Sequence, residues 1–356
     1  MGFATASDPL LAAAARIGAG ALLVSLAMLV AILALRLRLV ARLEHERRFT
    51  EAWEPVLGAW AAGETPPPPA LAREDAALFV GLWLRAQESL RGEAQARLNA
   101  LAAALGADRM AVRDLASGNP RRELQALVAA GHLRLAGIWP LAEALAAEAP
   151  PVVALAAAQA MLRIDARRAA VRVLSIAAGR EDWPIGRVGA MLRELDPALA
   201  GPALAAAIEA EWLEAPDGTG LPRMLRLLGA VTAEAARPWV REILARSTRP
   251  DVAAAAIETL WNPDDADVAR AQLAHGEWYV RLAAVKALGR IGSVRDREAL
   301  EARLSDANWW VRYRAAQALA RLPGVGREGL ERLRAAAQDR YAADMLAQVI
   351  SELEAA

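Results

Sequence analysis

VRLAAVKALGRI, at residues 280–291, and VRYRAAQALARL, at residues 311–322, are near-copies of one sequence placed 31 positions apart. A weaker copy, VALAAAQAMLRI, occupies residues 153–164. Recurrence at a spacing of about 20 to 50 residues is typical of proteins in which short structural units stack into an array. Such a protein usually works by presenting a long surface to a partner, and less often by enclosing a catalytic pocket.

The composition favours an all-α chain. Alanine and leucine dominate the 356 residues, whereas the β-branched and aromatic residues that favour strands are comparatively few. A chain of this length exceeds the usual size of a single core, so it must divide into domains or extend as an array. We predict a right-handed α-solenoid. Its helix pairs are expected to begin near residues 119, 151, 184, 221, 251, 279 and 310, followed by a lone helix from about Tyr341.

Residues that start helices mark the turns between these predicted helices. Asn119-Pro120, Asp196-Pro197 and Asn262-Pro263 each combine a side chain that caps a helix N-terminus with a proline suited to the first helical turn. Asp165 and Thr232 are predicted to cap two further second helices.

One face of each repeated helix is apolar. In the copy at 311–322, Val311, Ala315 and Leu319 lie at helical intervals, and small alanines let neighbouring helices approach to about 8–10 Å. One pair cannot bury this face alone, so stacked pairs are expected to share a continuous core. Matching core positions of successive repeats are filled by Leu260, Leu288, Leu319 and Ile350.

The charged and reactive residues exclude several classes of function. The chain carries 42 basic and 42 acidic residues, so it has no general attraction for nucleic acid. It has no cysteine, and its three histidines lie far apart without a metal-binding spacing. Neither a phosphate-binding glycine loop nor a nucleophile elbow with a triad is found. We therefore expect a protein that is not an enzyme and that uses no metal and no cofactor.

Residues 17–35 read IGAGALLVSLAMLVAILAL and contain no charge. A helix of this length spans about 28 Å, close to the hydrocarbon thickness of a bilayer. A cleaved signal peptide is the alternative, but the segment lacks a basic region before it and leads directly into Arg36, Arg38 and Arg42. The sequence therefore predicts one transmembrane helix in the inner (plasma) membrane after a short tail at 1–16. The arginines after the segment place the N-terminus outside and the rest of the chain in the cytoplasm.

Residues 36–62 are predicted to form an amphipathic helix beside the membrane. Its apolar stripe either packs on the domain that follows, which is the favoured interpretation, or brings Trp53 and Trp60 to the lipid headgroups. The candidate membrane-interface residues are Arg36, Arg38, Arg42, Trp53 and Trp60.

Four consecutive prolines, Pro66 to Pro69, predict an extended linker at 63–72. A helical block is expected at 73–118, with a break at Gly92, and the repeats fill residues 119–356.

The repeats resemble HEAT repeats, of the short type found in phycobilin-lyase-like proteins. The resemblance rests on WYVR at 278–281 and WWVR at 309–312, each followed by alanines and a leucine at matching positions. It is strong over 251–340 and degenerate between 184 and 250. One N-terminal span, a proline linker and an Arg-Gly-Glu helical block also resemble the layout of bacterial membrane-anchored HEAT proteins.

The WYVR and WWVR motifs, with Arg314 just after the second, supply the candidate partner-binding residues. Arg281 and Arg312 either pair with nearby acids, such as Glu277 or Asp306, or form an arginine ridge that faces an acidic partner. The tryptophans either pack between repeats or act as binding hot spots. The structural interpretation is favoured for both. The candidates are Trp278, Tyr279, Arg281, Trp309, Trp310, Arg312 and Arg314.

The sequence predicts a non-catalytic scaffold that binds a protein partner at the cytoplasmic face of the membrane. The resemblance to anchored HEAT proteins implies a membrane-associated partner, such as an envelope glycosyltransferase or a polysaccharide-export component. A bilin-lyase-like or other small-molecule enzyme built on the same repeats is one alternative, and a regulator that recruits a soluble partner to the membrane is another. A deep polar cavity would favour an enzyme, and a shallow groove would favour a scaffold.

Overall fold

Helices make up every regular element in the described part of the chain. The computed structural model describes residues 9–229, 231 and 234–355, and the side chains of residues 9–19, 21 and 24 lie outside the described set. No strand occurs among these residues, as the composition predicts. The chain divides into two compact units, Met1–Ala129 and Ala130–Ala356.

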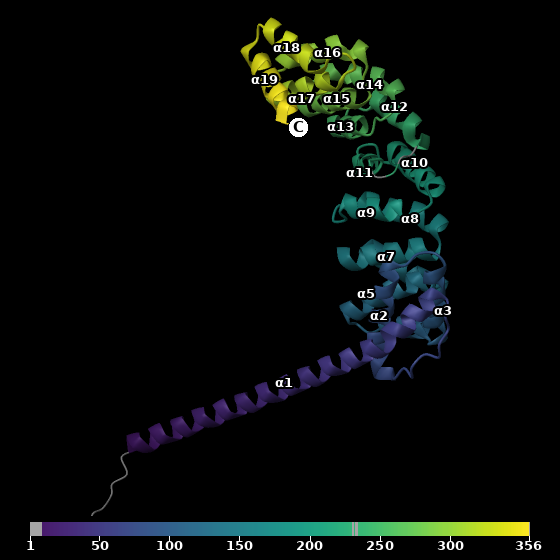
Figure 1. Cartoon of the computed structure of the whole chain (residues 1–356), viewed down its shortest axis with the longest axis vertical. Coiled ribbons are helices and arrows are strands. Elements are labelled where there is room, and N and C mark those ends of the chain that lie inside the picture. Colours follow the sequence, from purple (N-terminus) through teal and green to yellow (C-terminus); the bar gives the residue numbers. More distant parts are fainter. Residues whose placement is uncertain (1–8, 230, 232–233, 356) are drawn as a thin grey trace, which may run out of the picture. The chain divides into compact units, whose positions relative to one another are not determined.

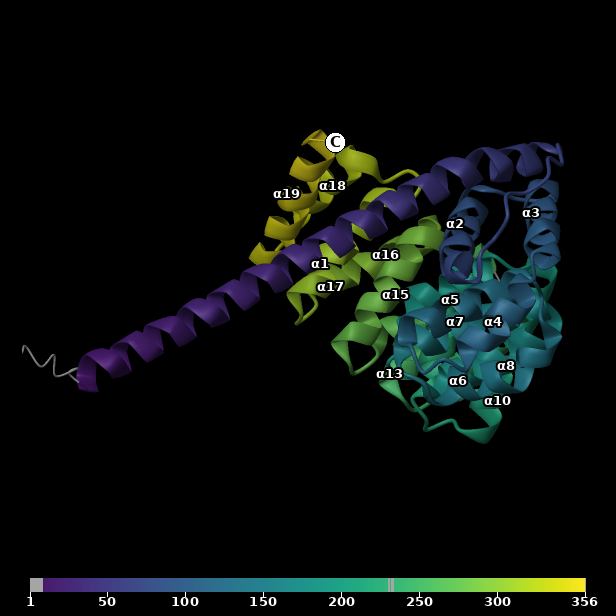
Figure 2. The ribbon, with the colours of Figure 1, turned by 90° about the horizontal axis from the view of Figure 1, so that it is seen from below.

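The first unit consists of one long helix and a group of short ones. Figures 1 and 2 show α2 and α3 against the C-terminal end of α1, while the rest of α1 extends away from them. The elements are α1 (Pro9–Ala62), η1 (Arg73–Asp75), α2 (Ala76–Ser89), α3 (Glu93–Ala104), α4 (Ala107–Leu115) and the first part of α5 (Pro120–His132).

α1 is continuous through both segments that the sequence distinguishes at 17–35 and 36–62. It ends at Ala62, where Gly63 has a φ of +99°, a backbone conformation that glycine adopts at little cost. The predicted break at Gly92 is confirmed, because α2 and α3 are separate helices and Gly92 has a φ of +64°.

The C-terminal end of α1 belongs to the core of the first unit. The Trp53 side chain is only 2% exposed, and its ring centroid lies 5.0 Å from that of Phe79 and 5.7 Å from that of Phe49. The Trp53 ring thus packs on the following helices, as the favoured interpretation has it, and the alternative in which Trp53 meets lipid headgroups is wrong. Trp60 is half-buried and its indole N–H donates to the carbonyl of Pro66 at 3.0 Å, which holds the proline segment on α1.

The N-terminal part of α1 is apolar and uncovered. Its described large apolar side chains from Leu22 to Leu43 are 54% to 71% exposed. Among the described residues, none of the helices has the length and hydropathy that crossing a bilayer requires. The transmembrane helix predicted at 17–35 is therefore not supported by these residues, and part of that segment, like residues 1–8 of the predicted tail, lies outside the described set. Arg36 and Arg38 are exposed, and Arg42 pairs with Glu46 at 3.0 Å.

The second unit is a series of helix pairs. It contains the rest of α5, η2 (Ala136–Ile138), α6 (Trp139–Glu148), α7 (Pro151–Ile164), α8 (Ala166–Gly179), α9 (Ile185–Arg193), α10 (Pro197–Glu214), α11 (Gly220–Leu227), η3 (Glu234–Ala236), α12 (Arg237–Arg246), α13 (Pro250–Glu258), η4 (Pro263–Asp265), α14 (Ala266–Ala271), η5 (Gln272–Ala274), α15 (Trp278–Ile291), η6 (Val294–Asp296), α16 (Arg297–Glu301), η7 (Ala302–Ser305), α17 (Trp309–Arg321), α18 (Gly326–Ala336) and α19 (Arg340–Ala355).

The start of each odd-numbered helix from α5 to α19 falls within one residue of its predicted start. Four predicted caps are confirmed, because their side-chain oxygens accept backbone N–H groups of the helix that follows. Asn119 accepts from Arg121 at 3.1 Å and Asp165 from Arg168 at 3.1 Å. Asp196 accepts from Ala198 and Asn262 from Asp264, both at 2.9 Å. Thr232 lies outside the described residues.

The helices of the second unit form two layers. The odd-numbered helices α11 to α19 pack one on the next, and Figure 1 shows the odd-numbered helices α7 to α17 on one side and α8, α10, α12, α14 and α16 on the other. The predicted core is confirmed, since Leu260, Leu288, Leu319 and Ile350 are all buried. α15 and α17 approach closely: a Cβ placed on Gly289 would lie 3.0 Å from the Cβ of Ala318.

Candidate partner-binding site

An ion pair connects the two best-preserved repeats. Arg281, in the first turn of α15, donates through Nη2 and Nε to the two carboxylate oxygens of Asp306 at 2.7 and 2.8 Å. Its Nη1 donates to the carbonyls of His275 and Gly276 at 2.9 and 2.8 Å. The predicted pairing of Arg281 with Asp306 is thus confirmed. Burial alone would raise the pKa of Asp306, but the hydrogen bonds from Arg281 and from the Asn308 amide lower it overall.

Arg312 occupies the position of Arg281 one repeat later but has no acidic partner in the described structure. Its Nη1 donates to the carbonyl of Asp306 at 2.7 Å, just as Arg281 donates to the turn before its own helix. Its guanidinium carbon lies 5.2 Å from the ring centroid of Tyr341, at the start of α19. The predicted acid partner of Arg312 is therefore wrong, and the reason is in the sequence: Ala337 stands 31 positions after Asp306.

Two further buried carboxylates form a repeated contact that the sequence analysis missed. Asp265 and Asp296, 31 positions apart, both lie in the 3-10 turn before a second helix and are almost fully buried. Asp265 Oδ2 accepts from Arg237 Nε at 3.0 Å, and Asp296 Oδ1 lies 2.6 Å from Arg270 Nη2. Each arginine comes from the preceding repeat. The 31-residue spacing of these aspartates was the available signal.

Four aromatic side chains stand at the starts of three successive odd-numbered helices. They are Trp278 of α15, Trp309 and Trp310 of α17, and Tyr341 of α19, and they are 40% to 63% exposed. We call them the aromatic edge. The rings of Trp309 and Trp310 stack at 3.9 Å. Contacts of Arg281 with Asp306 and of Arg312 with Tyr341 tie these helix starts together.

The tryptophans of the aromatic edge are only partly covered by the rest of the chain. Core packing between α15, α17 and α19 is supplied by small and aliphatic residues such as Ala284, Ala315 and Leu346, all of which are buried. The tryptophans sit at the helix starts and are 40% to 47% exposed, so part of each side chain is open to a partner. Tyr279 is half-buried beside Trp278, with the ring centroids 6.0 Å apart.

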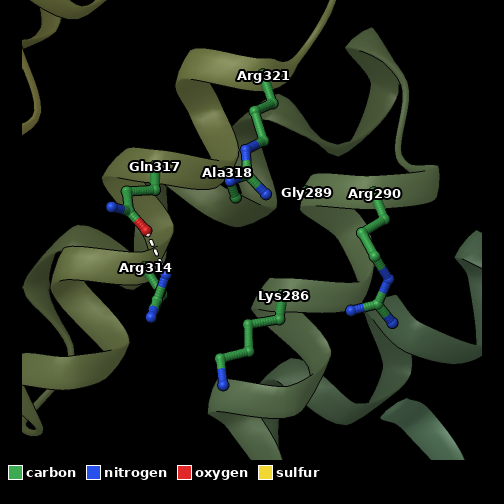
Figure 3. Close-up of a pocket in the computed structure, with 7 residues that line it drawn as sticks. All are labelled: Lys286, Gly289, Arg290, Arg314, Gln317, Ala318 and Arg321. Atoms are coloured by element: carbon green, nitrogen blue, oxygen red, sulfur yellow. Dashed lines mark hydrogen bonds between the residues drawn. The ribbon is translucent and has the colours of Figure 1, made fainter. Parts of the chain in front are cut away.

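Arg314, the remaining candidate, lines a different feature. A pocket of about 180 Å³ lies between α15 and α17, and Figure 3 shows its side chains extending from the two helices around a common space. It is lined by Lys286, Gly289, Arg290, Arg314, Gln317, Ala318 and Arg321. We call it the cationic pocket, because four of these side chains are basic. Burial lowers the pKa of Arg290 and the positive charge of nearby Arg321 acts in the same direction, while the Glu258 carboxylate opposes them in part.

Other parts of the described structure offer less for a ligand. A groove of about 410 Å³ between α1 and α2 is lined mainly by aliphatic residues and by Glu54 and Arg85. Among the described residues, no group of three or more His, Asp or Glu side chains is arranged to hold a metal ion. His45 instead contacts Asp75 at 2.6 Å, and this hydrogen bond raises the pKa of His45.

Comparison with known proteins supports the repeat architecture. Residues 266–354 match the family model of HEAT repeats, so the resemblance to HEAT repeats in general is confirmed over these residues. A search of curated proteins finds no match. Similar solved structures include karyopherin Kap121p bound to Pho4p, to Nup53p and to the SUMO protease Ulp1p. Each is 14% identical, with a TM-score of 0.39, over 77% of this chain and 41% of the other. The chain thus spans less than half the length of these relatives.

Proposed function

We propose that this protein is a non-catalytic scaffold that binds a protein partner through the aromatic edge. The observation that carries the proposal is the exposure of three tryptophans and a tyrosine at adjacent helix starts. Single exposed apolar residues are ordinary on protein surfaces, whereas neighbouring exposed aromatics are typical of interfaces. Tryptophan, tyrosine and arginine are also the residues that contribute most to protein–protein binding energy.

The chemistry of the pockets favours a scaffold over an enzyme. The cationic pocket holds four basic groups and one amide, which suits binding of an anion. General acid–base catalysis needs titratable groups poised near the working pH, such as a histidine or a carboxyl in the site. A bilin-lyase-like activity gains no specific support from this lining.

The scaffold is further proposed to be attached to the inner (plasma) membrane by residues 17–35, with its N-terminus outside and the repeats in the cytoplasm. The exposed apolar side chains of α1 from Leu22 to Leu43 support this attachment, because a surface of this kind is unfavourable in water. Arg36, Arg38 and Arg42 support the orientation. Attachment would confine the repeats to the membrane surface and raise the effective concentration of a membrane-bound partner. An envelope glycosyltransferase or a polysaccharide-export component is the proposed partner, on the resemblance in layout alone.

Replacing Trp309 and Trp310 with alanine together is expected to abolish co-purification of the partner with the full chain from detergent extracts of the native cells. A hot-spot side chain is worth about 2 kcal/mol or more, so losing two should weaken binding by more than about a hundredfold. Trp261→Ala is the matched control. Trp261 is about as exposed, but it follows the C-terminal end of α13, whereas the aromatic edge lies at the N-terminal ends of helices. Equal recovery of the partner with both variants would argue against the aromatic edge as the binding surface.

Membrane attachment predicts that the full chain stays with membranes after extraction at alkaline pH. The triple variant Leu26→Arg, Leu29→Arg, Leu33→Arg should be released, because each arginine in a membrane-spanning helix costs about 2.5–3.5 kcal/mol. The corresponding triple alanine variant keeps the apolar character and should remain bound. Release of the unmodified chain by alkali would contradict attachment, and a reporter fused to the C-terminus that is active outside the cytoplasm would contradict the orientation.

A further inference from the structure

The four basic side chains of the cationic pocket lie together without an ion-pair partner, whereas several other arginines of the same repeats are paired. Arg270, Arg281 and Arg297 each pair with a carboxylate. None of Lys286, Arg290, Arg314 and Arg321 forms an ion pair within the described structure, although the chain as a whole has a net charge of zero. The pocket therefore concentrates four unpaired positive charges in one small space.

The hydrogen bonds of these four groups go to neutral acceptors, although the carboxylates of Glu258 and Glu352 act electrostatically on Arg290 and Arg314. Arg290 donates to the backbone carbonyls of Glu258 and Leu260 at 3.1 and 3.3 Å, and Arg314 donates to the side-chain oxygen of Gln317 at 2.6 Å. These are neutral acceptors. Lys286 and Arg321 have no hydrogen bond or ion pair to any described residue. Bringing like charges together is unfavourable, and an anion that enters the pocket would relieve the repulsion.

The arrangement of the charges indicates the shape of that anion. Lys286 and Arg290 are one turn apart on α15, about 6 Å along the axis, and Arg314 and Arg321 are about 10 Å apart along α17. In an extended peptide, side chains two residues apart lie on one side at about 7 Å, which matches this spread. Carboxylates also suit guanidinium groups, which can bind them through two parallel hydrogen bonds.

We propose that the cationic pocket binds an acidic segment of the protein partner, in an extended conformation with aspartate or glutamate at alternate positions. The proposal rests on the proposed function, because it assumes that the partner is a protein, and it adds the chemistry of the bound segment. Glu352 bounds the site on the α19 side, where its carboxylate accepts hydrogen bonds from Tyr313 and Gln317. It would repel an acidic peptide there, so the segment should run along α15 and α17 and stop short of α19.

Lys286 gives this pocket a specific probe, because it is the only lysine in the sequence. Reductive methylation with ¹³C-formaldehyde therefore labels one side chain, and the N-terminal amine is distinguished by its own resonance. Titration at low ionic strength with a peptide of alternating glutamate and serine should shift the Lys286 methyl signal in a saturable way. The same peptide with glutamine in place of glutamate should leave it unchanged.

Affinity is measured separately, by fluorescence anisotropy of the labelled acidic peptide with the unmethylated full chain. Lys286→Gln combined with Arg321→Gln should weaken binding at least about tenfold, since a hydrogen bond to a charged group is worth this much or more. These two side chains hold no internal contact, so the fold should survive. Arg332→Gln with Arg334→Gln makes the same change in charge at exposed positions of α18 and should alter binding less than about twofold.

Three results would overturn the proposal. The first is no shift of the Lys286 signal with the acidic peptide, and the second is equal weakening of peptide binding by the two double variants. The third is a shift caused by inorganic phosphate or phosphatidylglycerol vesicles but not by the peptide. The last result would assign the pocket to a phosphate group.

The partner experiment with Trp309→Ala and Trp310→Ala is independent of these measurements. If it succeeds while the peptide fails to bind, only the chemistry of the segment is wrong. If it fails, the proposed function is wrong.

Discussion

Ala315→Glu is expected to unfold the C-terminal repeats. Ala315 is fully buried in α17, so the variant places a longer side chain and an unpaired carboxylate in a packed core. Overpacking costs about 1–3 kcal/mol and an uncompensated buried charge about 3–5 kcal/mol, so the free energy of unfolding should fall by about 4–8 kcal/mol. This is comparable to the stability of a whole domain.

The loss should be local, because in a stacked array each repeat contacts only its neighbours. Hydrogen exchange followed by mass spectrometry should show lost protection in peptides from α15 to α19, with protection kept in α7 and α8. Ala336→Glu, at an exposed position of α18, is the control and should leave protection unchanged. A variant at position 315 with the thermal stability of the parent chain would refute the stacked core.

Asp306→Ala is expected to be the next most damaging change. It leaves the guanidinium of Arg281, which is itself mostly buried, without its carboxylate, and it removes the acceptor of the Asn308 amide. Removing one partner of a buried pair costs about 3–5 kcal/mol. Denaturant unfolding should show this loss. Glu331→Ala, which breaks the exposed Arg327–Glu331 pair, should cost less than about 1 kcal/mol.

The same contact has a defined pH dependence. The pKa of Asp306 is lowered in the folded state, so its contribution to stability is present above the unfolded pKa of about 3.9 and is lost as the pH falls through the folded value. The parent chain should therefore lose stability more steeply than the Asp306→Ala variant in this acid range. If the acid denaturation curves of the parent chain and the Asp306→Ala variant run parallel, and their free energies of unfolding at neutral pH are equal, the Arg281–Asp306 pair contributes nothing to stability.

The sequence could predict the helix pairs because capping residues and the spacing of apolar residues recur with the same period as the repeat. Caps such as Asp196 and Asn262 act within a few residues, so their effect can be read without tertiary structure. The buried leucines follow from the helical period for the same reason. The degenerate region between 184 and 250 also has its helices near the expected places, since α9 and α11 begin at Ile185 and Gly220.

The candidate site was harder to predict because it depends on which residues meet across repeats. Trp53 packs against Phe79, which lies on another helix, whereas Trp309 is exposed. Only the three-dimensional neighbours distinguish them. The cationic pocket likewise combines residues of two helices, and a balanced total charge hides it in the composition. Arg314 was identified as a binding candidate, but Lys286, Arg290 and Arg321 were not.

The most direct test of the scaffold function is site-specific photo-crosslinking in the native cells. A photoreactive amino acid replaces Trp310 in the aromatic edge, and in a matched sample it replaces Trp261, which is equally exposed elsewhere. We predict one discrete crosslinked protein from position 310 and none from position 261, with the product lost when Trp309 is also changed to alanine. No product at position 310, or the same product from both positions, would contradict partner binding through the aromatic edge.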